Sequence, residues 1–276
     1  MFGLACRGVV VGCLVGVLAS RGRAWAQTPP PRAPTLEERL PLELIFADSI
    51  VPQDRHETML TTGGWMQRGR PETGDQVTQK VEWGVSDHLQ VSAFWMAVDH
   101  TRTPETASMG IGDLDLETRY SWRTQPADRW HLALSFNAGL PTGNVTRGLG
   151  GGVRTAGIAL LLSRDWPQSR VQMFMTTGVD AVAGTVAAAP ITHPRDALFV
   201  NGGVSIGASR GWAVVEVSVT NDRWDGGQVN DVRLTPAYVF RLASRCEVAV
   251  GVPLGVTRSA SRYGAVAKFT FEMGGG

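Results

Sequence analysis

The chain has 276 residues, and its 26 Lys and Arg nearly balance its 25 Asp and Glu, giving a formal net charge of +1. No basic stripe with interleaved aromatic residues is present, so a nucleic-acid partner is not expected. A content of 33 Gly and 15 Pro with only 18% charged residues is typical of a chain of strands and turns rather than of a helical protein.

Residues 1–26 have the features of a cleavable signal peptide. Arg7 supplies the positive charge, residues 8–20 form the apolar stretch, and Ala24-Trp25-Ala26 is a cleavage site of the A-x-A type. The peptide contains three Arg and no acid, so the mature chain has a net charge of 23 − 25 = −2. Two of the three cysteines lie in it, so Cys246 has no internal disulfide partner and the exported fold must be stable without one.

Residues 27–55 are predicted to form a periplasmic N-terminal linker or a partial plug. Residues 27–34 are rich in proline, which favours an extended and mobile conformation. Residues 42–49 suit a short strand or a segment inserted into the periplasmic mouth of a barrel, and the sequence leaves both interpretations open.

The remaining residues, 56–273, alternate apolar and polar side chains with period two, which predicts strands. The pattern is clearest over residues 113–122. Every second residue from Leu114 to Trp122 is apolar or a threonine, whereas four of the five residues on the other face, 113 to 121, are charged. An apolar outer face with a polar inner face is typical of a transmembrane barrel.

Twelve stretches follow this rule, and short connections alternate with long ones along most of the chain. We therefore predict an all-β fold: a closed antiparallel up-and-down transmembrane β-barrel of about 12 strands, with both termini in the periplasm. The predicted strands are 57–68, 76–85, 89–98, 113–122, 131–140, 153–163, 170–180, 197–208, 212–220, 232–242, 247–254 and 263–272.

In this register, ten charged side chains are predicted to line the lumen. They could form a structural ion-pair network that fills a narrow barrel, or a polar conduit whose charges tune permeation. The predicted lining residues are Lys80, Glu82, Asp113, Asp115, Glu117, Arg119, Glu216, Arg233, Arg241 and Lys268.

A rim motif follows from the same register. Strands 113–122 and 131–140 are joined by the turn at 123–130, so their other ends must meet at the outer rim of the barrel. This places two short glycine-containing patches side by side, formed by Gly110, Gly112, Asp113, Pro141, Thr142 and Gly143.

These patches carry a family resemblance. Gly-Ile-Gly-Asp-Leu-Asp-Leu-Glu at 110–117 and Gly-Leu-Pro-Thr-Gly-Asn at 139–144 resemble the outer-membrane β-barrel family named for the MetA pathway of phenol degradation, sometimes labelled transporter. The resemblance runs from about residue 76 to the C-terminus, and Gly-Val-Pro-Leu at 251–254 fits the penultimate strand of that family. It implies an outer-membrane barrel associated in some cases with the catabolism of aromatic compounds, and it implies no enzymatic residue.

The motifs that suggest catalysis lack the context that catalysis needs. Residues 203–207 match G-x-S-x-G, but a nucleophile elbow requires a strand-to-helix turn, and Ser205 lies within a predicted strand. His131 and Ser135 share a predicted lumen face without an identifiable third member. The five histidines lack metal-ligand spacing, so no catalytic residue, metal or cofactor is predicted, and the protein is not expected to be an enzyme.

The leading functional hypothesis is an outer-membrane channel or transporter for small molecules, aromatic or apolar ones among them. A closed barrel with a structural or surface-interaction role is the alternative, and a membrane-embedded hydrolase is a third. The expected location is the outer membrane of a Gram-negative-type cell. The expected partners are outer-membrane lipid, a small-molecule substrate that the sequence does not identify, and the barrel-assembly machinery during biogenesis.

Overall fold

The computed structural model describes residues 41–69, 73–102, 107–122, 130–147, 149–166, 168–185, 194–224 and 227–274. The predicted signal peptide, residues 1–26, and the proline-rich stretch that follows it lie outside the described residues. Within the described part of the chain, no helix is long and apolar enough to cross a membrane.

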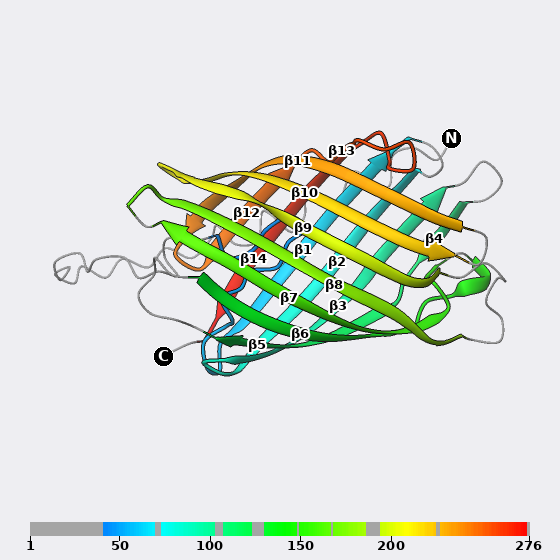
Figure 1. Cartoon of the computed structure of the whole chain (residues 1–276), viewed down its shortest axis with the longest axis horizontal. Coiled ribbons are helices and arrows are strands. Elements are labelled where there is room, and N and C mark those ends of the chain that lie inside the picture. The colour runs from blue at the N-terminus through cyan, green and yellow to red at the C-terminus, as the bar shows by residue number, and fades with distance from the viewer. Residues whose placement is uncertain are drawn as a thin grey trace, which may run out of the picture. The chain divides into compact units, whose positions relative to one another are not determined.

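The described strands form one antiparallel sheet (Figure 1). A short 3-10 helix, η2 (Val145–Arg147), lies in the loop between β6 and β7. The strands are β1 (Thr58–Arg68), β2 (Thr73–Ser86), β3 (Leu89–Arg102), β4 (Ala107–Gly110), β5 (Leu114–Trp122), β6 (Trp130–Leu140), β7 (Val153–Trp166), β8 (Val171–Thr185), β9 (Pro194–Ala208), β10 (Gly211–Trp224), β11 (Gly227–Ala243), β12 (Cys246–Gly251), β13 (Leu254–Gly255) and β14 (Tyr263–Met273).

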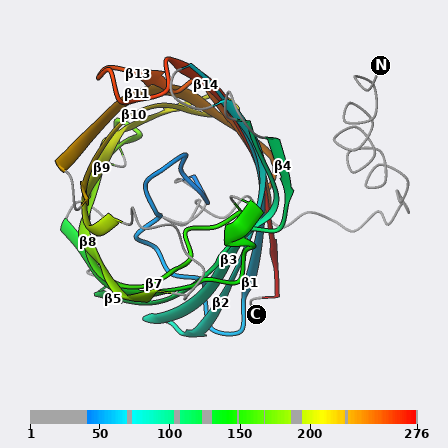
Figure 2. The same ribbon diagram turned by 90° about the vertical axis from the view of Figure 1, so that its right-hand side faces the viewer.

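The sheet closes on itself. β1 pairs with β14 along its whole length, from Thr58 opposite Met273 to Arg68 opposite Tyr263. Figure 2 shows the resulting ring of strands viewed along the barrel. Apart from the short β4, which pairs with β3 alone among the described strands, closure gives each strand two neighbours and removes the exposed sheet edge that a membrane would not tolerate.

In two places, two consecutive described strands together make up one strand of the barrel. β4 and β5 lie end to end along β3, and β12 and β13 both pair with β11 and β14. Counting each pair once gives twelve strands around the barrel, which confirms the predicted fold class.

Two predicted strands are shorter than expected at these interruptions. The strand predicted to begin at Asp113 begins at Leu114, and the strand predicted over 247–254 is broken after Gly251. The second break contains Pro253, which has no backbone N–H to donate to the ladder. Other strands are longer than predicted, because pairing continues where both faces are polar and the alternation is lost. β11, for example, has 17 residues.

The barrel has two distinct ends. At one end, which we call the short-turn end, two-residue turns join β2 to β3, β9 to β10 and β11 to β12. The opposite end, called the long-loop end here, carries the connection between β6 and β7. Aromatic rings gather on the outer surface near the short-turn end, where Tyr120 and Trp122 pack edge to face at 4.8 Å and Arg164 lies 5.0 Å from the ring of Trp166. Such a belt suits a membrane–water interface.

Candidate channel lumen

Residues 41–53, called the inner segment here, lie inside the barrel. Figure 2 shows their blue trace within the ring of strands. The segment has no regular secondary structure, yet it is well packed. Its apolar side chains join clusters with residues of the barrel wall, and its buried members are Leu44, Ile45, Ala47 and Ile50.

One carboxylate on the wall receives three successive backbone amides of this segment. Glu216 Oε1 lies 2.7 Å from the nitrogen of Ile45, and Glu216 Oε2 lies 2.7 Å from that of Phe46 and 3.2 Å from that of Ala47. Glu216 is on β10 and is 0% exposed. A charge buried this deeply is costly unless it is hydrogen-bonded, so the inner segment and Glu216 stabilise each other.

Other wall side chains bind five further backbone atoms of the segment. Lys268 donates to the carbonyl of Leu44 at 2.7 Å, and Arg119 donates to that of Ser49 at 2.6 Å. Further bonds join Leu42 N to Glu247, Ser121 to Ile50 O, and Gln53 N to Gln90, at 2.8–3.0 Å. The wall thereby supplies partners that an irregular segment cannot supply to itself.

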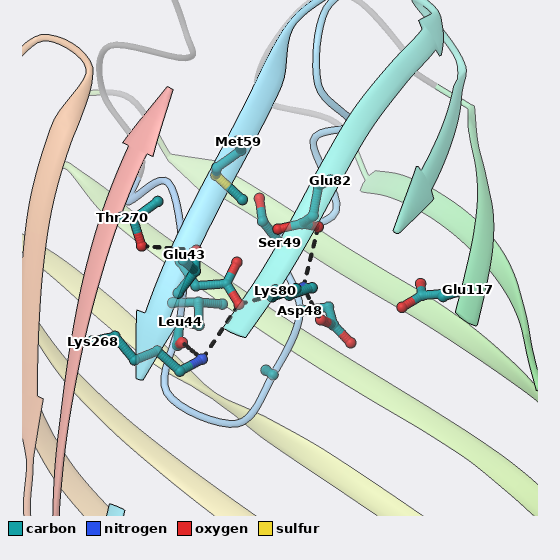
Figure 3. A network of polar contacts seen from close by, with 12 residues as sticks. Glu43, Leu44, Asp48, Ser49, Met59, Lys80, Glu82, Glu117, Lys268 and Thr270 are labelled. Carbon is teal, nitrogen blue, oxygen red and sulfur yellow. Dashed lines mark hydrogen bonds and ion pairs between the residues drawn. The ribbon is translucent and has the colours of Figure 1, made fainter. Parts of the chain in front are cut away.

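An ion-pair network connects the same segment to β2 and β14 (Figure 3). Lys80 Nζ lies 3.4 Å from Glu43, 3.0 Å from Asp48 and 3.1 Å from Glu82. Lys268 reaches the same Glu43 carboxylate at 3.3 Å. Two acids of the inner segment are thus bound by lysines from the wall.

A second branch of the network runs through Arg119 on β5. Its guanidinium lies 3.3 Å from Asp48 and 2.8 Å from Glu117. Burial raises the pKa of Asp48, but the ammonium of Lys80 and the guanidinium of Arg119 outweigh it and hold that pKa well below its ordinary value.

The ten predicted lining residues therefore divide into two groups. Six belong to the network around the inner segment: Lys80, Glu82, Glu117, Arg119, Glu216 and Lys268. The other four have no direct contact of this kind with the segment. Arg241 pairs at 2.8 Å with Glu247, whose other oxygen accepts from Leu42 N, and Arg233 pairs with Asp231. Asp113 and Asp115 lie towards the long-loop end.

Sequence reasoning missed several members of this network. Glu43 and Asp48 lie outside every strand, so alternation said nothing about their direction. Glu247 was identifiable, because it shares a face of its strand with Ala249 and Gly251, which the pattern places inside. The inner position of Gln90 also follows from alternation, but a neutral amide gives no signal in a search for charges.

The structure brings the residues of the rim motif together at the long-loop end. Asp113 Oδ1 accepts a hydrogen bond from Gly143 N at 2.9 Å, and Thr142 Oγ1 donates to Gly112 O at 3.2 Å. Asp113 Oδ2 also accepts from Gly151 N at 2.7 Å. Pro141 leads directly into this loop, and Gly110 lies against Leu149, which is 1% exposed. The aspartate thus fixes the loop between β6 and β7 at both of its ends.

The residues that suggested catalysis are dispersed in the wall. Ser205 is buried within β9, with its hydroxyl 3.5 Å from Gln172 Oε1, and forms no nucleophile elbow. His131 Nε2 lies 3.3 Å from Asp165 Oδ2, a partner that the sequence did not reveal because the predicted strand ended at residue 163. In the described ranges, no group of three or more His, Cys, Asp or Glu residues could hold a metal ion.

Comparisons with known proteins agree with the barrel geometry. No family model matches the sequence, and no curated protein matches it. The COG4313 outer membrane channel from Pseudomonas putida F1 is structurally similar, with a TM-score of 0.67 and 8% identity over 83% of this chain and 100% of that chain. The NanC porin gives a TM-score of 0.54 with 10% identity over 78% of this chain and 100% of its own. The KdgM porin gives 0.53 with 6% identity over 78% and 99%.

These structural neighbours are outer-membrane channel and porin barrels, and at such low identity they establish the fold alone. The resemblance to the MetA-pathway family remains a prediction, since no family model matches.

Proposed function

We propose that this protein is an outer-membrane channel for small molecules whose lumen is narrowed by the inner segment. The closed ring of strands, with apolar side chains outside and charged side chains inside, supports a transmembrane role. The likeness to channel and porin barrels supports passage through the lumen.

The observation that carries the proposal is the way the inner segment is bound. Most of its ties to the wall join its backbone or its acids to charged side chains, such as Glu216, Arg119 and Lys268. These bonds, together with the buried apolar side chains of the segment, hold it in place inside the closed ring. Solutes would therefore pass beside the segment through a narrowed lumen.

Aromatic or apolar small molecules are the proposed substrates. The resemblance at 110–117 and 139–144 motivates this class. An aromatic pair inside the lumen supports it: Phe46 of the inner segment packs edge to face on Trp65 with ring centroids 5.0 Å apart, and Arg233 lies 5.6 Å from the Trp65 ring. A planar solute could stack on these rings.

The remaining parts of the proposal concern location and partners. The chain is exported by the signal peptide at 1–26, is inserted by the barrel-assembly machinery and resides in the outer membrane, where lipid covers its apolar surface. We assign residues 27–55 as the periplasmic N-terminal linker and partial plug, of which the inner segment, residues 41–53, lies in the lumen, and residues 56–273 as the barrel.

Single-channel conductance of the full chain in planar bilayers tests this function. We expect discrete current steps in potassium chloride, together with swelling of protein-containing vesicles in small neutral solutes. Met173→Leu, a change on the outer face of β8, should keep both signals. Absence of current at every voltage and salt concentration would instead favour a closed barrel, for which the dense ion-pair network around Lys80 is the supporting observation.

A further inference from the structure

Three buried polar side chains on β6 and β7 are not part of the network around the inner segment. Ser163 lies directly opposite His131, and Asp165 follows two residues later on the same inner face of β7. The side chains of His131 and Asp165 are 10% and 3% exposed, and Ser163 is 1% exposed. All three lie at the short-turn end of the barrel, where β7 leads into β8. The proposed channel function gives them no role.

The polar atoms of these side chains lack hydrogen bonds. Among the described residues, no hydrogen-bond partner exists for His131 Nε2, Ser163 Oγ or either carboxylate oxygen of Asp165, although all four atoms are buried. Buried polar atoms of native proteins are almost always bonded, so four such atoms in one place indicate a further binding partner. A bridging water needs a cavity of about 10–15 Å³, whereas a metal ion bonded at about 2 Å needs less room. The close burial of these atoms therefore favours a metal ion.

The negative charge of Asp165 also favours a cation at this place. Its neighbour Arg164 faces the outer surface, where the guanidinium lies 5.6 Å from the ring of Trp130. Gln172, opposite Asp165 on β8, is neutral. Within the described ranges, the ion-pair partner of Asp165 is His131, which carries a positive charge only when it is protonated. Buried charges are either paired or bound to metals, and a metal ion would balance the carboxylate beside a neutral imidazole.

The distance between His131 and Asp165 suits two ligands of one ion. Nε2 and Oδ2 lie 3.3 Å apart without forming a hydrogen bond. In a tetrahedral zinc site with bonds of about 2.0–2.1 Å, two nitrogen or oxygen ligands lie about 3.3–3.4 Å from each other. Ser163 faces His131 across the ladder as a direct cross-strand neighbour, so its hydroxyl can supply a third ligand.

The geometry points to a binding site for one divalent transition-metal ion of the Zn²⁺ type, with His131 Nε2 and the Asp165 carboxylate as its main ligands and Ser163 Oγ as a third. An imidazole ligand favours zinc over magnesium and calcium, which prefer oxygen ligands alone. The site has two residues of the His, Cys, Asp and Glu types, and the described ranges contain no larger group of them. The ion would join β6 to β7 two residues from Ala133, which belongs to the same buried cluster as Ile50 of the inner segment.

Calorimetric titration of the full chain with zinc sulfate tests the site. The protein is folded in detergent and freed of metal with EDTA, and Cys246→Ser is the background so that the free thiol cannot bind the ion. We expect one Zn²⁺ per chain and no comparable binding of Mg²⁺. His131→Gln and Asp165→Asn should each weaken zinc binding by more than about 100-fold, because loss of even an outer partner of a metal ligand costs about 10–100-fold.

His100→Gln is the matched control. His100 Nδ1 lies 4.0 Å from Asp75, but the two side chains are 35% and 45% exposed, so water can hydrate both. This variant should bind Zn²⁺ as the background protein does. Equal Kd values for zinc in the background protein and in His131→Gln would overturn the site, and so would loss of binding in His100→Gln.

Ser163→Cys tests the site by a gain of affinity, which a variant that fails to fold cannot imitate. A thiolate is a usual zinc ligand and a hydroxyl is not, so this variant should have a lower Kd for Zn²⁺. Zinc should also raise the temperature at which its folded form loses its shifted mobility in detergent gels. A Kd and a transition temperature that both stay unchanged would overturn the site. None of these measurements involves current, so the metal site and the proposed channel can fail independently.

Discussion

Glu216 Oε2 lies 2.7 Å from the backbone nitrogen of Phe46, a residue 170 positions earlier in the chain. Two more amides of the inner segment share the same carboxylate. A side chain that the strand pattern places in the lumen thus binds a segment that the pattern does not describe. In the proposed channel, the position of the inner segment, and with it the width of the lumen, therefore depends on the carboxylate of Glu216.

Replacing Glu216 by Gln should loosen the inner segment. The amide has one oxygen and no charge, so it cannot serve three donors, and each lost bond to a charged group costs about 1.5–3 kcal/mol. Hydrogen exchange of the amides at 45–47 is expected to become faster in Glu216→Gln, while exchange along β5 stays as in the wild type. Equal protection of the segment in both proteins would show that Glu216 does not hold it.

Gly84 should be intolerant of any side chain. A Cβ atom there would lie 1.9 Å from the carbonyl oxygen of Asp54 and 2.6 Å from that of Gln53, where the inner segment leaves the lumen. Overpacking of this kind costs about 1–3 kcal/mol. Gly84→Ala should therefore lower the temperature at which the folded barrel loses its shifted mobility in detergent gels. Gly184→Ala, where a Cβ meets nothing within 4 Å, is the matched control and should melt as the wild type does.

Removal of Arg119 should lower the stability of the protein more than removal of any other single cation. It is 1% exposed and binds Ser49 O, Asp48 and Glu117. Its loss leaves Glu117 without this counter-ion and Asp48 with Lys80 alone; breaking a fully buried pair costs about 3–5 kcal/mol, which is the upper bound here. Thermal unfolding of Arg119→Met should show this loss, and Arg223→Gln, on an exposed pair with Asp196, should show almost none. Equal thermal stability of Arg119→Met and Arg223→Gln would mean that the ion-pair network contributes little to the stability of the fold.

The charge state of Asp48 predicts a pH dependence. The pKa of this carboxyl is held below its ordinary value of 3.8, so its stabilising contribution is fully present above that value and is lost only as the pH falls further, towards the lowered pKa. Current recorded between pH 8 and pH 5 should therefore not change on account of Asp48. In Lys80→Met the pKa of Asp48 should rise, and the inner segment should be released at a higher pH than in the wild type. A variant with the same acid response as the wild type would contradict this role of the ion pair.

Alternation of side chains was sufficient to predict the barrel. Leu116 and Tyr120 face outward and Arg119 inward, because a strand in a membrane must present opposite chemistry to lipid and lumen. The neighbourhood of Asp113 and Gly143 also followed from strand order alone, since the ends of a hairpin must meet.

The inner segment could not be predicted in the same way. Its position depends on contacts such as Ile45 with Glu216, in which an irregular backbone meets residues far away in the chain. No period in the sequence encodes such contacts. The break between β4 and β5 was missed for a related reason. β4 and β5 pair with β3 in one register, from Asp99 opposite Gly110 to Trp95 opposite Leu114, so the break is a short loss of ladder at 111–113 that alternation does not encode.

The most direct test of the account is the single-channel current of wild-type protein compared with Glu216→Gln. The account predicts discrete steps in both proteins, with larger or more frequent open states in Glu216→Gln and no change in Met173→Leu on the outer face of β8. Identical currents in the wild type and Glu216→Gln would contradict the claim that the inner segment narrows the pore. Absence of current in all three proteins would contradict the channel itself.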